Sequence, residues 1–150
     1  MKKNSKLVKN FKKILIANRG EIAVRIIKTA KNLGLKTVAV YSDEDSDSLH
    51  AKLADEKINI GKGPSAESYL SIKNIVNAAK NTKSDAIHPG YGFLSENADF
   101  AKKCKKEKLI FIGPDYNTID SMGNKKIAKS IAMKVGVPCL DDFSILSKEK

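Results

Sequence analysis

Residues 88–97 hold an unusual concentration of side chains that could take part in chemistry. The stretch reads HPGYGFLSEN and combines an imidazole, a tyrosine, a carboxylate and two glycines. His88 could act as a general base, because its unperturbed pKa lies near neutrality. The proline that follows holds His88 in an extended conformation, which suits a structural hinge equally well. We therefore predict a ligand-facing loop in which His88 is either catalytic or, as we favour, structural.

The rest of this stretch predicts how the loop could meet a ligand. Gly90 and Gly92 permit a positive φ and a close approach of the backbone. Ser95 is a typical helix cap, and the amide N–H groups at the start of a following helix would suit an anion. Glu96 would lie in the first turn of that helix, where the helix dipole favours a carboxylate. Together with Tyr91 and His88, these residues form the candidate edge of a site.

The arginines indicate a second position of interest. Only two of the 28 Lys and Arg residues are arginines, Arg19 and Arg25, and both lie in the segment NRGEIAVR. A guanidinium offers a planar fork of donors that lysine cannot copy, so this placement suggests a geometric requirement. The alternative is chance placement combined with an ordinary helical ion pair between Glu21 and Arg25. We include Arg19 in the candidate site edge.

The elements that would position these residues follow from the apolar pattern. Short apolar runs predict strands, and longer segments with apolar residues at helical spacing predict helices. In the first helix, the residues expected to face the core are Ile22, Ile26, Ala30 and Leu33, and Gly34 should end the helix. We expect strands at 13–17, 36–41, 57–60, 85–88 and 109–113, and helices at 21–33, 49–55, 71–82, 96–107, 116–122 and 125–135.

The order of these elements predicts the fold class. Strands and helices alternate without two-residue hairpin signals, which indicates an α/β fold with a doubly wound, mainly parallel five-stranded sheet and right-handed crossovers. In such sheets, functional loops lie beyond the carboxyl ends of the strands. The segments 18–21, 88–97 and 113–115 should therefore meet at one edge.

Composition excludes several functional classes. The net charge is +11, but the lysines are spread along the chain and no nucleic-acid-binding motif accompanies them, so we expect no nucleic-acid partner. No apolar run approaches the roughly 20 residues that span a bilayer, and the basic start is a poor secretory signal, so we expect no membrane association. Cys104 and Cys139 lack metal-ligand spacing and are expected to be reduced, as in the cytoplasm or an organelle matrix. Neither GxGxxG nor the Walker motif is present.

Several segments, taken in order, carry a family resemblance. These are ILIANRGEIAVRII, LADE, SYL, HPGYGFLSEN, FIGP and MGNK. From about residue 12 to residue 138 the chain resembles the N-terminal part of the biotin carboxylase component of biotin-dependent carboxylases. These include the acetyl-, propionyl- and methylcrotonyl-CoA carboxylases and pyruvate carboxylase. The resemblance implies a pre-ATP-grasp, Rossmann-like domain at 12–138, preceded by a basic arm at 1–11. Residues 139–150 are an unmatched tail, where an ATP-grasp domain would begin.

The resemblance also implies a reaction, the ATP-dependent carboxylation of carrier-bound biotin by bicarbonate. The implied cofactors are ATP, biotin and magnesium or manganese, with the metal bound by the ATP-grasp domain. The implied partners are the ATP-grasp and C-terminal domains, the biotin carboxyl carrier protein and a carboxyltransferase subunit. No catalytic or metal-binding residue is assigned to this chain, which we expect to be inactive alone. The alternative is a non-catalytic binding or assembly module of the same fold.

Three further residues acquire roles from the resemblance. In the family, the lysine of the motif that resembles MGNK contacts the nucleotide phosphates, which points to Lys125. The residue before it is usually an aspartate and here is Asn124. The first helix often contributes to a dimer in the family, so Arg25 and Lys28, which would share an exposed face with Asn32, are candidate interface residues.

Overall fold

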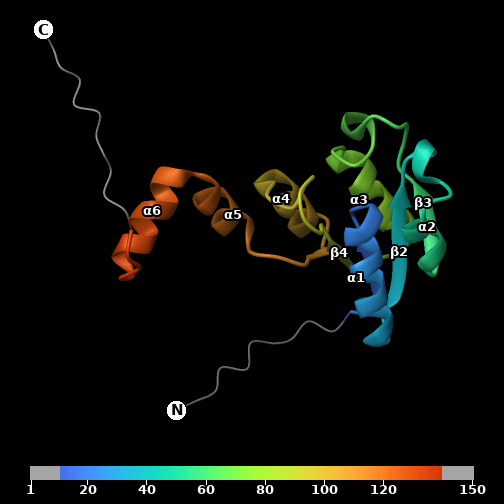
Figure 1. Ribbon diagram of the computed structural model, residues 1–150, viewed down its shortest axis with the longest axis horizontal. Coiled ribbons are helices and arrows are strands. Elements are labelled where there is room, and N and C mark those ends of the chain that lie inside the picture. The colour runs from blue at the N-terminus through green and yellow to red at the C-terminus, as the bar shows by residue number, and fades with distance from the viewer. Residues whose placement is uncertain (1–10, 140–150) are drawn as a thin grey trace, which may run out of the picture.

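The computed structural model describes residues 11–139 and contains a five-stranded parallel sheet (Figure 1). The predicted fold class is confirmed. Residues 1–10 and 140–150 are not described, so the predicted basic arm and tail lie almost entirely outside the described residues. The strands are β1 (Lys13–Ile16), β2 (Lys36–Tyr41), β3 (Glu56–Asn59), β4 (Ala86–His88) and β5 (Ile110–Phe111). The helices are α1 (Gly20–Asn32), α2 (Leu49–Leu53), α3 (Ile72–Asn81), α4 (Ala98–Lys106), α5 (Tyr116–Gly123) and α6 (Lys125–Lys134).

The strand order places one pair of loops at the centre of the sheet. The order is β3-β2-β1-β4-β5, so the chain winds outward from β1 and then returns to the other side of β1 as β4. Ile16 at the end of β1 is in register with His88 at the end of β4. In open parallel sheets, ligands bind where the winding direction reverses in this way. The loops that follow β1 and β4 are therefore neighbours at that position.

Each face of the sheet is covered by helices. Side chains alternate along β1, so Leu15 packs against the layer of α3 and α4, while Ile14 and Ile16 pack against α1. Successive strand residues point to opposite faces, which explains why a run of consecutive apolar residues is needed here. The layer containing α3 and α4 includes the buried Phe100 and Cys104.

The buried face of α1 differs from the expected one. The buried residues are Ala23, Ile27 and Ala30, whereas Leu33 is 72% exposed. Ala30 belongs to both the predicted and the observed face. The prediction of Ile22 and Leu33 as core residues was wrong because α1 contains more apolar residues than one face can hold. The direction in which the helix meets the sheet selects among them. Gly34 ends the helix with a φ of +75°, as predicted.

The C-terminal helices stand apart from the sheet. α5 contacts α4 and α6 contacts α5, and Figure 1 shows these two helices extending away from the other layers. No residue of α6 is buried, and its exposed apolar side chains include Ile127, Ile131 and Met133. No helix among residues 11–139 is long and apolar enough to cross a membrane. Cys104 and Cys139 are free thiols, as predicted.

Candidate functional site

Asn18 joins the loops after β1 and β4. Its side-chain amide donates to the carbonyl oxygens of Pro89, at 2.8 Å, and Tyr91, at 2.9 Å. Its Oδ1 accepts from the backbone N–H of Arg19 at 2.9 Å. Asn18 is almost completely buried, so these bonds satisfy a polar group that would otherwise be costly to bury. The predicted meeting of the NRG and HPGYG segments is thereby confirmed.

Gly90 is required where these loops touch. Its φ is +70°, and a Cβ atom there would lie 2.6–2.9 Å from the side chain of Asn18. The backbone N–H of Gly90 donates to Nδ1 of His88 at 3.0 Å. Burial lowers the pKa of His88, and an Nδ1 that accepts this bond belongs to a neutral ring. These contacts favour the structural interpretation of His88 over the catalytic one.

The expectation of amide groups aimed at an anion was partly wrong. The N–H of Gly90 is occupied by His88, that of Ser95 donates to the carbonyl of Gly92 at 2.9 Å, and that of Asn97 donates to the carbonyl of Leu94 at 3.1 Å. The loop uses these donors to hold its own turns. Gly92 also has a φ of +70°, as predicted, and Tyr91 is 75% exposed between the two glycines.

The start of α4 corrects two further predictions. α4 begins at Ala98, and its cap is Asn97, whose Oδ1 accepts from the N–H of Phe100 at 2.8 Å. Ser95 is therefore not the cap, and Glu96 precedes the helix instead of lying in its first turn. Both Ser95 and Asn97 are suitable cap residues, so the sequence alone did not distinguish them. Asp99 is the acidic residue in the first turn.

Arg19 lies in a network that residue types alone did not reveal. Its guanidinium forms an ion pair with Asp45 at 2.5 Å and lies over the ring of Tyr69, 5.8 Å from the centroid. The Tyr69 hydroxyl donates to the other carboxylate oxygen of Asp45 at 2.6 Å and accepts from the N–H of Ser42 at 3.2 Å. The geometric requirement predicted for Arg19 thus has a physical basis, a planar cation that contacts both a carboxylate and an aromatic face.

The charges in this network stabilise one another. Burial raises the pKa of Asp45, but the hydrogen bonds from Arg19, Tyr69 and Ser42 outweigh burial and leave the pKa below its usual value. The hydrogen bond with Asp45 raises the pKa of Arg19. Burial, followed by the bond to Asp45, raises the pKa of Tyr69 to about 12. Asp45 is therefore a carboxylate and Tyr69 a neutral phenol at physiological pH.

The aromatic ring of Tyr69 connects this network to the HPGYGFLSEN loop. The rings of Tyr69 and Phe93 stack with centroids 5.1 Å apart and an interplanar angle of 14°. The sequence alone assigns no role to Asp45 or Tyr69. The available signals were the polar Asn18 directly after an apolar strand and the isolated aromatic residue in SYL.

The start of α6 lies close to the same edge. Glu96 and Asn124 line a common pocket of about 490 Å³, and Glu96 also lines a neighbouring pocket with Pro114. The segments 88–97 and 113–115 therefore meet, as predicted. Asn124 caps α6, because its Oδ1 accepts from the N–H groups of Lys126 and Ile127. Asparagine caps a helix about as well as aspartate, so the replacement keeps the cap and removes only a charge. Lys125 follows as the first, exposed residue of α6.

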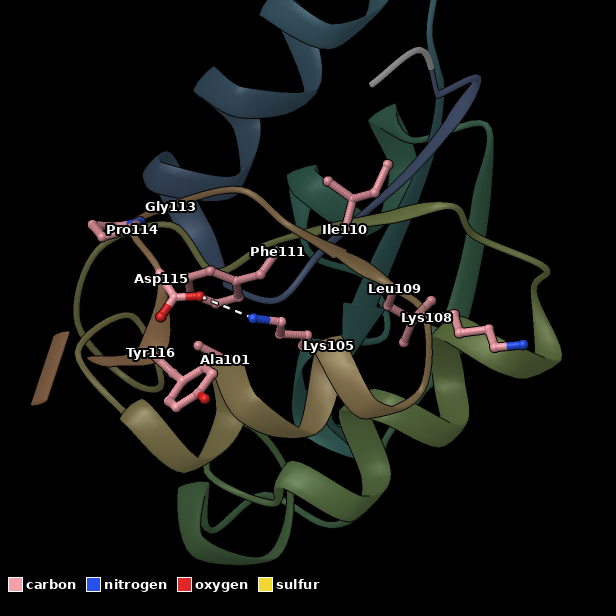
Figure 2. A pocket seen from close by; sticks show the side chains of 10 residues that line it. All are labelled: Ala101, Lys105, Lys108, Leu109, Ile110, Phe111, Gly113, Pro114, Asp115 and Tyr116. Atoms are coloured by element: carbon pink, nitrogen blue, oxygen red, sulfur yellow. Dashed lines mark hydrogen bonds and ion pairs between the residues drawn. The ribbon is translucent and has the colours of Figure 1, made fainter. Parts of the chain in front are cut away.

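A third pocket lies beside β5. Figure 2 shows Lys105 directed across this pocket towards Asp115, with the ring of Tyr116 nearby. The Lys105–Asp115 distance is 3.4 Å, and the pocket has a volume of about 590 Å³. No residue of the 88–97 loop lines it. The pocket is lined by Gly113, Pro114 and Asp115 of the functional edge, but not by Arg19 or Tyr91.

The candidate interface residues lie on the outer surface of α1. Arg25, Lys28 and Asn32 are all exposed, as their spacing predicted. In the part of the chain that the structure describes, Arg25 makes no ion pair with Glu21. The alternative explanation for Arg25, an ordinary helical ion pair with Glu21, is therefore not supported. Among the described residues no cluster of three or more His, Cys, Asp or Glu could hold a metal ion.

Comparisons with known proteins agree with this architecture. Residues 10–119 match the family model "Biotin carboxylase, N-terminal domain". Biotin carboxylase 1 of Bacillus subtilis is 55% identical over 128 residues, which are 85% of this chain and 28% of that protein. The mitochondrial methylcrotonoyl-CoA carboxylase subunit alpha of Dictyostelium discoideum is 53% identical over 136 residues, 91% of this chain and 20% of that protein. The chain thus spans less than a third of the length of these curated relatives.

Solved structures show the same likeness. The biotin carboxylase domain of a thermophilic 2-oxoglutarate carboxylase bound to bicarbonate is 45% identical with a TM-score of 0.84, covering 88% of this chain and 30% of that chain. The urea amidolyase of Kluyveromyces lactis is 52% identical with a TM-score of 0.85, covering 87% of this chain and 8% of that chain. The family match includes both the ANRGEIA and the HPGYGFLSEN segments, whose contacts form the edge described above. The chain therefore belongs to the family of biotin carboxylase N-terminal domains.

Proposed function

We propose that this chain is the N-terminal domain of an ATP-dependent biotin carboxylase. The enzyme would carboxylate biotin on a carrier protein with bicarbonate, as the first half-reaction of an acyl-CoA or keto-acid carboxylase. The observation that carries this proposal is the family match over residues 10–119, because the matched region contains both of the loops that Asn18 joins. The compartment we propose is the cytoplasm or an organelle matrix.

In this proposal, the residues of the chain position ligands and do not perform the chemical step. The loops held by Asn18 present Tyr91 and Glu96 towards the rest of the active site. Lys125 contacts the nucleotide phosphates, which fits an exposed ammonium group in the first turn of α6. ATP, when bound, supplies the activated phosphoryl group. Magnesium or manganese would be held by the ATP-grasp domain.

The proposal predicts that the chain alone does not turn over but completes a related enzyme. A chimera would replace the aligned region of the Bacillus subtilis biotin carboxylase with this chain, and ADP release would be measured with and without biotin and bicarbonate. We expect biotin- and bicarbonate-dependent ATP hydrolysis by the chimera and none by the 150-residue chain. A folded chimera that binds ATP without this turnover would favour the alternative, a binding or assembly module of the same fold. Biotin-dependent turnover by the chain alone would contradict its assignment as an incomplete catalytic unit.

A further inference from the structure

Asp45 occupies a central position among the loops at the functional edge. Both of its carboxylate oxygens are used, one by the guanidinium of Arg19 and the other by the hydroxyl of Tyr69. The Ser42 hydroxyl also contacts the second oxygen, at 3.3 Å. The Asp45 side chain is only 10% exposed, so water cannot readily replace these partners. Asp45 therefore connects the loop after β1 with the loops after β2 and β3.

The connection continues to the loop after β4 through an aromatic pair. Tyr69 is almost completely buried, and its ring stacks on that of Phe93. Asp45 does not touch the 88–97 loop itself. The Tyr69 side chain therefore makes both contacts, since its hydroxyl donates to Asp45 and its ring stacks on Phe93.

The 88–97 loop has a conformation that needs such support. Phe93 has a φ of +42°, in a region that non-glycine residues rarely adopt, and it lies between the positive-φ residue Gly92 and the buried Leu94. A backbone conformation of this kind is unfavourable in free energy on its own and persists only when the surrounding structure imposes it. The Tyr69 ring stacks on Phe93, and Asn18 holds the carbonyls of Pro89 and Tyr91.

We propose that Asp45 is a positioning residue that, through Arg19 and Tyr69, sets the conformation of the 88–97 loop and hence the placement of the exposed Tyr91. Asp45 would contact no substrate. The part of this inference that concerns placement in an active site rests on the proposed function, whereas the coupling between Asp45 and the loop does not.

The coupling can be tested on the 150-residue chain with Asp45→Asn. An amide retains an acceptor for one partner, but it removes the charge that holds Arg19 and one of the two acceptor positions. Backbone amide signals would be followed by two-dimensional ¹⁵N NMR. We expect the signals of residues 90–94 to shift or broaden, although they lie at least 45 positions further along the sequence than residue 45. Unchanged signals at 90–94 would overturn the proposal.

Asp47→Asn is a matched control. Asp47 lies in the same loop and carries the same charge, but its side chain is 93% exposed, and within residues 11–139 its only ion pair is with Lys52, at 3.6 Å. This variant should leave residues 90–94 unchanged. If Asp45→Asn does not fold, Tyr69→Phe offers a second test, because it keeps the ring and removes only the hydroxyl that joins it to Asp45. It should shift the same signals, and a spectrum with unchanged 90–94 signals would reject the coupling.

The kinetics of the active chimera described above distinguish positioning from a purely structural role, because a purely structural role of Asp45 would not lower kcat selectively. Asp45→Asn should lower kcat by about tenfold to a hundredfold, the loss expected when a positioning contact is displaced by about 1 Å, and change the KM for ATP less than twofold. An equal change in both constants would argue against positioning. If the loop signals shift in the chain but the unmodified chimera is inactive, the proposed function fails while the coupling stands.

Discussion

At the scale of single residues, surroundings decide the role of each candidate side chain. His88 lies at the end of a strand, as expected, but its Nδ1 accepts a hydrogen bond from the N–H of Gly90. The other histidine of the chain, His50, is buried and contacts the hydroxyl of Ser48 and the carbonyl of Val40. Burial lowers the pKa of both rings. Both histidines are therefore neutral structural groups in the folded chain at physiological pH.

These lowered pKa values predict how stability depends on pH. A histidine whose pKa is lower in the folded state binds fewer protons there than in the unfolded chain, so folding weakens as pH falls below about 6.5. We expect the free energy of unfolding to be lower at pH 5.5 than at pH 7.5. In His88→Asn, whose Oδ1 can still accept from Gly90, the drop should be smaller. Urea unfolding at both pH values would measure this, and an equal drop in the variant would contradict a contribution from His88.

Lys125 provides a prediction about nucleotide binding. In the active chimera, Lys125→Ala should raise the apparent KM for ATP about tenfold or more, because a lost charge-assisted contact costs about 1.5–3 kcal/mol. The KM for bicarbonate should change less. Lys126→Ala is the control, since Lys126 is the next exposed lysine of the same helix. An unchanged ATP dependence in Lys125→Ala, or an equal effect in Lys126→Ala, would show that Lys125 makes no specific contact.

At the scale of elements, α1 shows where pattern and packing diverge. Its periodicity predicted a helix correctly, and Gly34 ends it as expected. The helix nevertheless buries Ala23 and Ile27 and leaves Leu33 exposed. A similar difference occurs at α4, where Asn97 and not Ser95 is the cap. Element existence is a local property, whereas the face that is buried depends on the neighbouring layer.

The buried face of α1 can be tested by truncation. Ile27→Ala removes a side chain that is fully buried against the sheet and should destabilise the chain by about 2–5 kcal/mol. Leu33→Ala removes a similar volume from an exposed position and should change stability by less than about 0.5 kcal/mol. Chemical denaturation of both variants would decide between the two faces. A larger loss for Leu33→Ala would restore the face expected from periodicity.

At the scale of the whole molecule, apolar side chains are exposed on helices that stand apart from the sheet. α5 and α6 extend away from the sheet (Figure 1), and the apolar Ile127, Ile131 and Met133 are exposed on α6. The chain also spans less than a third of its curated relatives. Both facts agree with the proposal that further domains complete the enzyme.

The oligomeric state is a further prediction at this scale. Arg25, Lys28 and Asn32 give the exposed face of α1 little negative charge, and a two-fold interface must be complementary to itself. We therefore expect the 150-residue chain to be monomeric or weakly dimeric in light scattering at tens of micromolar. A dimer that survives dilution and is broken by Arg25→Glu would show that α1 carries a complete interface.

The sequence by itself determined the order of strands and helices, the parallel sheet and the family. These depend on hydrophobic period, on local signals such as Gly34, and on contiguous motifs. It also predicted that residues 18–21 and 88–97 lie close together, because the carboxyl ends of parallel strands share one edge. Only the tertiary structure decided that Asp45 and Tyr69 join these loops. Residues 19, 45, 69 and 93 lie in four separate loops, and their contacts depend on the strand order β3-β2-β1-β4-β5 and on side-chain packing. No local pattern encodes such contacts, because each partner becomes a neighbour only after the sheet has formed.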